Sequence, residues 1–153
     1  MLEEKAMVPD VGADDQNGRH VDLRTFAGRP LVVYFYPKAD TPGCTVETQA
    51  FRDLDAAFEA AGASIVGVSR DTVADQKKFA DKYGVKFPLL ADTSSHICDA
   101  FGVIVEKNMY GKKSRGIQRS TFLIGPDGRI AKVWPRVSVE GHAQAVLKAV
   151  SAE

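Results

Sequence analysis

The sequence predicts an α/β fold with a central mixed sheet. Two continuous apolar runs, 31–36 and 64–69, are rich in β-branched and aromatic residues and have the length of strands buried on both faces. Amphipathic stretches that suit helices follow both runs, and this alternation is typical of parallel pairing. Near the C-terminus, the turn sequence 125–128 separates two further strands, 119–124 and 129–134, which are expected to form an antiparallel hairpin.

The N-terminal part is predicted to add a short β extension to this sheet. Strands are expected near 9–11 and 20–23, on either side of a cluster of turn residues. Within that cluster, Asn17-Gly18 is a good pair for a tight turn. One helical turn is expected over 24–26.

The first long helix is predicted to begin shortly after the strand 31–36. Pro37 ends the strand, Thr41 can cap the helix, and Pro42 suits the first helical position, where its missing N–H has no partner to lose. Gly62 ends the helical stretch. Four apolar residues at a spacing of four define the face that we expect to be buried: Val46, Ala50, Leu54 and Phe58.

Helices and strands continue to alternate through the rest of the chain. Helices are expected over 71–83, 94–101 and 142–150, and a short strand over 88–91. This order of elements is that of a thioredoxin-like fold with helices flanking the central mixed sheet and an N-terminal β-hairpin extension. The length of 153 residues suits a single core, so we expect one domain over 1–153.

Composition excludes several classes of protein. Twenty basic and twenty acidic residues give a formal net charge of zero, so neither nucleic acid nor a membrane is expected as a partner. No apolar run approaches the roughly 20 residues that span a bilayer, and the N-terminus lacks the pattern of a secretion signal. Two cysteines are too few for a disulfide framework, so a cytoplasmic location with reduced thiols is expected.

Cys44 is the first candidate for chemistry, because it lies in the first turn of a helix that follows a buried strand. Free N–H groups and the helix dipole at such a position favour the nucleophilic thiolate. Thr41 lies three residues earlier and can bring a hydroxyl near the sulfur, while Arg119 can supply a permanent positive charge from a strand of the same sheet. Each residue alone has an ordinary structural interpretation, namely a core thiol, a helix cap and a solvated arginine. Their combination favours a redox site.

The segment 37–45, Pro-Lys-Ala-Asp-Thr-Pro-Gly-Cys-Thr, matches the peroxiredoxin signature P-x-x-x-T-x-x-C. The flanking residues 34–36 and Glu47 narrow the resemblance to the PrxQ branch, also called bacterioferritin comigratory protein. Two later segments, 109–112 and 116–124, resemble the second signature block of that branch. The resemblance covers nearly the whole chain.

This resemblance implies a thiol peroxidase that reduces hydrogen peroxide and organic hydroperoxides to water and alcohols. Cys44 would be the peroxidatic cysteine, whose thiolate attacks a peroxide oxygen and becomes a sulfenic acid. Thr41 would bind the peroxide, and Arg119 would stabilise the thiolate and the charge that develops on oxygen. Pro37 would shield the thiolate from solvent, and Glu47 would help to orient the network around the arginine.

The expected route of recycling depends on the second cysteine. Members of the branch place a resolving cysteine five residues after the peroxidatic one or on the following helix, where this chain has Gln49 and Ala80. We therefore expect a one-cysteine-type cycle, in which thioredoxin, glutaredoxin or a small thiol reduces the sulfenic acid. Cys98 would share an apolar helix face with Phe101, which is typical of a core thiol. A two-cysteine cycle with Cys98 as resolving residue is the alternative.

Two other classes of function compete with a peroxidase. A thioredoxin-like disulfide oxidoreductase needs Cys-x-x-Cys, but positions 41 and 47 hold Thr and Glu. A non-catalytic chaperone or redox-sensing protein could use the same fold. Histidines and glycines show neither metal-ligand nor phosphate-binding spacing, so no metal and no other cofactor is expected. Relatives of the PrxQ branch are often monomers, which favours a monomer here.

A basic stretch overlaps the second signature block. Its positive residues are Lys107, Lys112, Lys113, Arg115 and Arg119. We interpret this stretch as a solvated loop. The alternative is a surface that docks an acidic reductant, or that raises the positive potential around Arg119.

Overall fold

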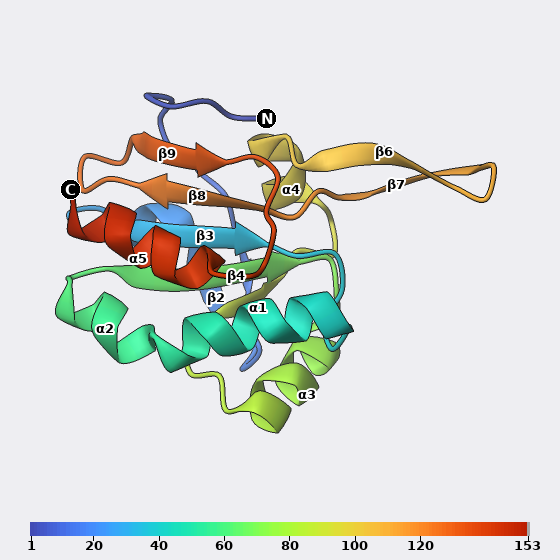
Figure 1. Cartoon of the computed structure of the whole chain (residues 1–153), viewed down its shortest axis with the longest axis horizontal. Helices are drawn as coiled ribbons and strands as arrows, with labels where there is room; N and C mark the ends of the chain where they lie inside the picture. Colours follow the sequence, from blue (N-terminus) through green and yellow to red (C-terminus); the bar gives the residue numbers. More distant parts are fainter. Residues whose placement is uncertain (153) are drawn as a thin grey trace.

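The structure, a computed structural model, describes residues 1–152 of the chain. At its centre lies a five-stranded mixed sheet with the strand order β5-β4-β3-β8-β9 (Figure 1). The strands are β3 (Leu31–Phe35), β4 (Ser64–Ser69), β5 (Leu89–Ala91), β8 (Ser120–Ile124) and β9 (Ile130–Trp134). β3 pairs in parallel with β4 and antiparallel with β8, so the predicted mixed sheet is confirmed.

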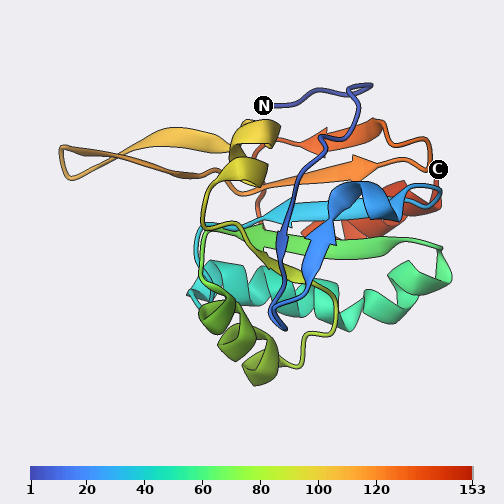
Figure 2. The same ribbon diagram turned by 180° about the vertical axis from the view of Figure 1, so that it is seen from behind.

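Both faces of this sheet are covered, which explains why β3 is apolar at every position. Helices α1 (Pro42–Asp53), α2 (Asp55–Ala60), α3 (Val73–Tyr83) and α5 (His142–Ser151) contribute to the core on one face. Helix α4 (His96–Phe101) and the N-terminal segment cover the other face, as the reverse view in Figure 2 shows. Val32 and Tyr34 lie in the first core, and Val33 and Phe35 lie in the second, as the two-residue repeat of a strand requires.

The N-terminal hairpin is confirmed, although its first strand lies three residues later than predicted. β1 (Gly12–Asp14) pairs antiparallel with β2 (His20–Asp22), followed by the 3-10 turn η1 (Leu23–Phe26). The connecting turn decides this register. Gly18 takes a left-handed conformation with φ of 73°, and its N–H donates to the carbonyl of Asp15. Asp14 then pairs with His20, and β1 extends backwards from that pair.

The predicted apolar face of the first helix is confirmed in part, because Phe58 is buried in the core and Ala50 and Leu54 pack against it. The helix is interrupted at Leu54, which separates α1 from α2, and Val46 is 55% exposed. The residues of α1 that are buried are Cys44, Glu47, Thr48 and Phe51. Two of them are polar and have partners inside the fold, so a pattern based on hydrophobicity could not find this face.

The basic stretch is not a loop, as the sequence suggested, but an antiparallel hairpin. β6 (Ile104–Met109) and β7 (Lys112–Ile117) pair only with each other and project from the body of the molecule (Figures 1 and 2). Tyr110 and Gly111 connect them with φ angles of 53° and 77°, as a two-residue type I′ turn requires. Because no core covers this ribbon, its sequence lacks the apolar alternation that would have predicted it.

Among the described residues, no helix combines the length and the apolar character that crossing a membrane requires.

Candidate active site

The loop between β3 and α1 is held by hydrogen bonds from two neighbouring elements. A single carboxylate oxygen of Asp71 accepts from the backbone N–H of Ala39 at 2.7 Å and from the Ser69 hydroxyl at 2.6 Å. Asp40 has a φ of 58°, and its carboxylate contacts Lys82 of α3 at 3.0 Å. The loop therefore delivers the start of α1 to a defined position at the end of β3.

Cys44, Arg119 and Glu47 form a connected group at this position. A guanidinium nitrogen of Arg119, Nη2, lies 3.1 Å from Cys44 Sγ. The other terminal nitrogen, Nη1, donates to Glu47 Oε1 at 2.7 Å. Cys44 and Glu47 are each 1% exposed. The two residues of α1 thus hold one guanidinium between a sulfur and a carboxylate, and the expected proximity of Arg119 to Cys44 is present in the structure.

Gly43 gives the guanidinium room to lie against the start of α1. A β-carbon at this position would lie 3.2 Å from Arg119 Nη2, which is tighter than an ordinary contact. Sequence reasoning missed this residue. The available signal was a glycine inside the first turn of a helix, where it lowers helix propensity and therefore needs another reason to be present.

Burial dominates the electrostatics of Glu47. It raises the pKa of this carboxyl from 4.5 to about 7, even though the neighbouring Arg119 guanidinium acts in the opposite direction. The second oxygen, Oε2, is buried and has no hydrogen-bond partner among the described residues. For Arg119, burial lowers the pKa, but the charge of Glu47 and the contact with Cys44 outweigh it, and the pKa is raised. The Arg119 guanidinium therefore carries a permanent positive charge beside the sulfur.

Thr41 and Pro37 lie on the loop that precedes α1. Thr41 occupies the predicted N-cap position, but its side chain makes no capping hydrogen bond. Its hydroxyl instead donates to the carbonyl of Lys38 at 2.8 Å, which leaves the oxygen lone pairs free to accept. Pro37 is exposed. Contact with a peroxide and shielding of the sulfur stay predictions for these two residues.

Two buried tyrosines of β3 and its extension form the base on which α1 packs. Tyr34 stacks on Phe51 with ring centroids 4.6 Å apart, and its hydroxyl lies 3.0 Å from the hydroxyl of Thr48. Tyr36 donates a hydrogen bond of 2.6 Å to Gln76 of α3. Burial raises the pKa of both tyrosines, so both hydroxyls remain protonated and neutral. These contacts position α1, and hence Cys44, on the sheet.

Cys98 is not brought to the site. It lies on α4, in the core on the opposite face of the sheet from Cys44. It is fully buried, and its backbone N–H donates to Asp92 at 2.8 Å. Burial, together with the negative charge of Asp92, raises the pKa of the Cys98 thiol well above its usual range. This cysteine is therefore a protonated core thiol, as its apolar surroundings suggested.

His142 is a buried neighbour of the site that the sequence did not single out. Its Nε2 lies 2.8 Å from the hydroxyl of Thr121, and its ring meets Trp134 edge to face. Burial, with a contribution from the charge of Arg119, lowers the pKa of His142 from 6.5 to about 4. The imidazole is therefore neutral near pH 7.

Glu47 and His142 are expected to give opposite pH dependences of stability. The raised pKa of Glu47, about 7 instead of 4.5, gives a contribution that is complete below pH 4.5 and is lost as the pH rises through 7. The lowered pKa of His142, about 4 instead of 6.5, gives a contribution that is complete above pH 6.5 and is lost as the pH falls through 4. A shift of this size corresponds to about 3 kcal/mol in each case, and the two contributions have opposite pH dependence, so they nearly cancel in the wild-type protein.

Replacing one of the two titrating side chains should make the pH dependence that the other contributes visible in the stability of the protein. We expect the free energy of unfolding of Glu47→Gln to increase from about pH 4.5 to 6.5, and that of His142→Gln to decrease over the same interval. Urea unfolding at a series of pH values measures both slopes. Equal slopes in the two variants would contradict the assignment.

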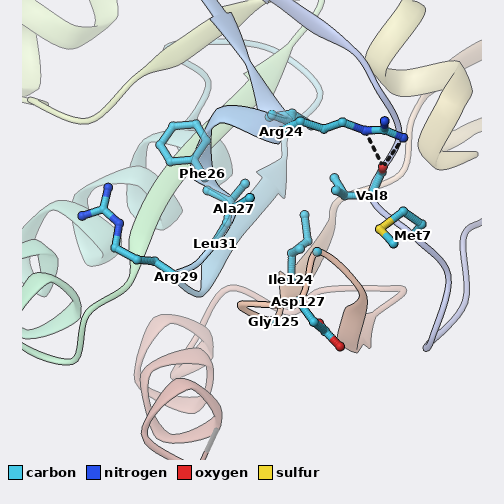
Figure 3. Close-up of a pocket in the computed structure, with 12 residues that line it drawn as sticks. Met7, Val8, Arg24, Phe26, Ala27, Arg29, Leu31, Ile124, Gly125 and Asp127 are labelled. Atoms are coloured by element: carbon cyan, nitrogen blue, oxygen red, sulfur yellow. Dashed lines mark hydrogen bonds between the residues drawn. The ribbon is translucent and has the colours of Figure 1, made fainter.

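An apolar pocket lies away from this site. It has a volume of about 350 Å³ and is lined by Leu31 and Ile124, among others (Figure 3). Leu31 begins β3, whereas Cys44 follows the other end of that strand. The pocket and the Cys44 group are therefore at opposite ends of the central strand. No group of three or more potential metal ligands occurs within residues 1–152.

Comparison with known proteins adds to this geometry. Residues 5–133 match the AhpC/TSA family. The chain is 49% identical to peroxiredoxin Bcp of Xanthomonas campestris, with 99% of this chain and 95% of that protein aligned. It is 41% identical to peroxiredoxin Bcp of Bacillus subtilis, over 92% of this chain and 89% of that protein.

Solved structures show the same similarity. A structure of peroxiredoxin Q from Xanthomonas campestris superposes with a TM-score of 0.92 at 49% identity, over 99% of this chain and 96% of that one. Peroxidoxin BcpB from Mycobacterium tuberculosis superposes with a TM-score of 0.85 at 35% identity, over 99% and 98%. A further structure describes the alkyl peroxide reduction activity of the Xanthomonas bacterioferritin comigratory protein.

Proposed function

Since this chain belongs to the AhpC/TSA family and is a peroxidase of the peroxiredoxin type, we propose that Cys44 is its peroxidatic residue. The observation that carries the proposal is the contact of 3.1 Å between Cys44 Sγ and Arg119 Nη2 at the start of α1. A guanidinium at that distance stabilises a thiolate and can follow the negative charge to a peroxide oxygen. Alkyl peroxide reduction by the Xanthomonas relative supports organic hydroperoxides as substrates in addition to hydrogen peroxide.

The proposed first step transfers one oxygen atom to the sulfur. The Cys44 thiolate attacks the terminal oxygen of the hydroperoxide, an S–O bond forms, and the O–O bond breaks. The electron pair leaves on the second oxygen, which takes up a proton and departs as water or an alcohol. Arg119 stabilises the negative charge as it moves from sulfur to that oxygen. Cys44 is left as a sulfenic acid.

Three further residues support this step in the proposal. Thr41 would bind the peroxide, because its hydroxyl oxygen has free lone pairs at the start of α1. Glu47 would act as a positioning residue, because its hydrogen bond of 2.7 Å fixes the orientation of Arg119. Pro37 would limit access of water to the sulfur from the loop side.

For recycling we propose a one-cysteine-type cycle. The position of Cys98 on the opposite face of the sheet supports it, because a disulfide requires the two Cα atoms to approach within about 7 Å. An external thiol would instead attack the sulfenic acid, forming a mixed disulfide and releasing water. A second thiol would then displace Cys44. Thioredoxin, glutaredoxin and small thiols can supply these electrons, and their reduced state is maintained in the cytoplasm.

Intact-mass measurement after treatment with one equivalent of peroxide tests this cycle. We expect a gain of one oxygen atom, which dimedone traps as a sulfenic acid adduct on Cys44. The Cys98→Ser variant should give the same adduct, because Cys98 takes no part. A loss of two hydrogens in the wild-type protein that Cys98→Ser abolishes would establish the two-cysteine alternative instead.

A further inference from the structure

The β6–β7 hairpin carries a concentration of positive charge that the peroxidase site does not use. The hairpin contains four cations, Lys107, Lys112, Lys113 and Arg115, but a single carboxylate, that of Glu106. Because the whole chain has a formal net charge of zero, the rest of the molecule has an excess of negative charge. The ribbon therefore differs in charge from the body that carries it.

The two faces of the ribbon are not equivalent. On one face, Glu106 pairs across the strands with Arg115, and its carboxylate lies 3.7 Å from the Lys113 ammonium. Lys107 and Lys112 occupy the register positions that alternate with the pair of Glu106 and Arg115, so their side chains lie on the opposite face of the ribbon. That face contains no carboxylate. This carboxylate-free face is continuous with the turn at the tip of the ribbon.

Tyr110 at the tip is 98% exposed. A tyrosine that packs against nothing in its own chain has its full apolar ring and its hydroxyl available. Tyrosine is enriched where proteins meet one another, since its ring is buried at a low cost in side-chain entropy. The tip therefore combines an aromatic anchor with adjacent positive charge.

The root of the hairpin adjoins the active site. Ile117 at the end of β7 is buried, and the N–H of the next residue, Gln118, donates to the carbonyl of Val103 at 2.7 Å. Arg119 follows directly. Figure 1 shows the ribbon leaving the body on the side where β3 ends and α1 begins. Strands of this length extend about 20 Å, at roughly 3.4 Å for each residue.

We propose that the β6–β7 hairpin docks a dithiol protein with an acidic surface, which reduces oxidised Cys44. This rests on the proposed function, because it names the reductant of that site. The tip of the ribbon lies about 20 Å from its root, so a small thiol cannot contact the tip and the sulfur at the same time. A protein domain of about 100 residues has a radius of gyration of roughly 13 Å and is therefore large enough to contact both. Opposite charges would steer such a protein to the site and hold it in one orientation.

Other occupants fit the charges less well. A second copy of this chain in a two-fold contact would bring the same positive face against itself, with repulsion as the result. Nucleic acid favours proteins with an overall positive charge, and this chain has none. Both occupants are nevertheless separate outcomes of the test below.

The test compares two electron donors in peroxide turnover. Thioredoxin and glutaredoxin, each with its recycling system, serve as protein probes, and dithiothreitol serves as the small one. We expect the variant Lys107→Glu/Lys112→Glu to lower kcat/KM for the better protein donor by about tenfold, and Tyr110→Ala to lower it by a comparable factor. Turnover with dithiothreitol should stay within about twofold of wild type. The control variant is Lys148→Glu on α5, which makes the same type of charge reversal away from the hairpin. It should leave kcat/KM unchanged with both kinds of donor.

Docking would be contradicted if the hairpin variants left kcat/KM for the protein donor unchanged, or if they lowered kcat/KM for dithiothreitol by the same factor. It would also be contradicted if the wild-type enzyme turned over no faster with the protein donors than with dithiothreitol. Binding of a labelled DNA at about 0.1 M salt that the double variant loses would assign the hairpin to nucleic acid. A dimer in sedimentation that the double variant dissociates would assign it to a second copy. Failure of wild-type protein to consume peroxide with any donor would instead reject the proposed function.

Discussion

Replacement of Cys44 by serine is expected to lower the rate of peroxide consumption by at least about 10³-fold, to the uncatalysed background. A serine hydroxyl is far less nucleophilic at neutral pH than a thiolate, and it cannot form the sulfenic acid that the cycle requires. The substitution only exchanges the sulfur for a smaller oxygen at one buried position, so the fold should persist. Peroxide consumption with dithiothreitol as donor measures the effect directly.

Cys98→Ser provides the matched control, because it makes the same chemical change in the other core. Its peroxidase rate should remain within about twofold of wild type. Its stability should fall by about 1–3 kcal/mol, because a hydroxyl is buried there among apolar side chains. If Cys98→Ser lost peroxidase activity while Cys44→Ser kept it, the assignment of Cys44 as nucleophile would be wrong.

The second large effect is expected at Arg119. Arg119→Gln removes the positive charge 3.1 Å from the sulfur, and we expect the second-order rate of Cys44 oxidation to fall by about 10²–10³-fold. Arg119→Lys keeps a charge, but one ammonium cannot reproduce the planar arrangement that contacts Cys44 and Glu47 together. An intermediate loss of about tenfold is expected for it. Stopped-flow fluorescence of Trp134, the single tryptophan, can follow the oxidation step.

Arg29→Gln is the control for the loss of a charge, since Arg29 is exposed and lines the pocket at the opposite end of β3. It should leave the oxidation rate unchanged. Urea unfolding of Arg119→Gln separates catalysis from folding, because Glu47 loses its partner in that variant. An oxidation rate of Arg119→Gln equal to that of wild type in a folded protein would show that the guanidinium does not act on the reacting atoms.

Local sequence was sufficient for a strand that is buried on both faces and for a helix with a regular apolar repeat. β4 occupies the predicted residues Ser64–Ser69, and α5 begins at the predicted His142. Such segments carry a strong signal because nearly every position must be apolar or must follow the helical repeat. The start of α1 was predictable for a related reason, since Pro42 and Thr41 favour one position in a helix through their own covalent structure.

Local sequence could not predict which polar side chains are buried, nor a hairpin that packs against no core. Glu47 and Thr48 face the core because Arg119 and Tyr34 meet them there, and these partners are distant in sequence. β6 and β7 have no core to cover, so only their pairing with each other defines them. In both cases the stabilising interaction is made between residues whose proximity exists only in the folded chain.

The sequence by itself therefore determined the α/β class, the nucleophile at a helix start and the family resemblance, since these depend on residue types at short spacings. Only the tertiary structure decided that Arg119 lies in contact with the sulfur, that the two cysteines lie on opposite faces of the sheet, and that the basic segment projects beside the site. The physical reason is that hydrogen bonds and charges act through distances of a few ångströms. Strand pairing, and not position along the chain, brings Arg119 to Cys44.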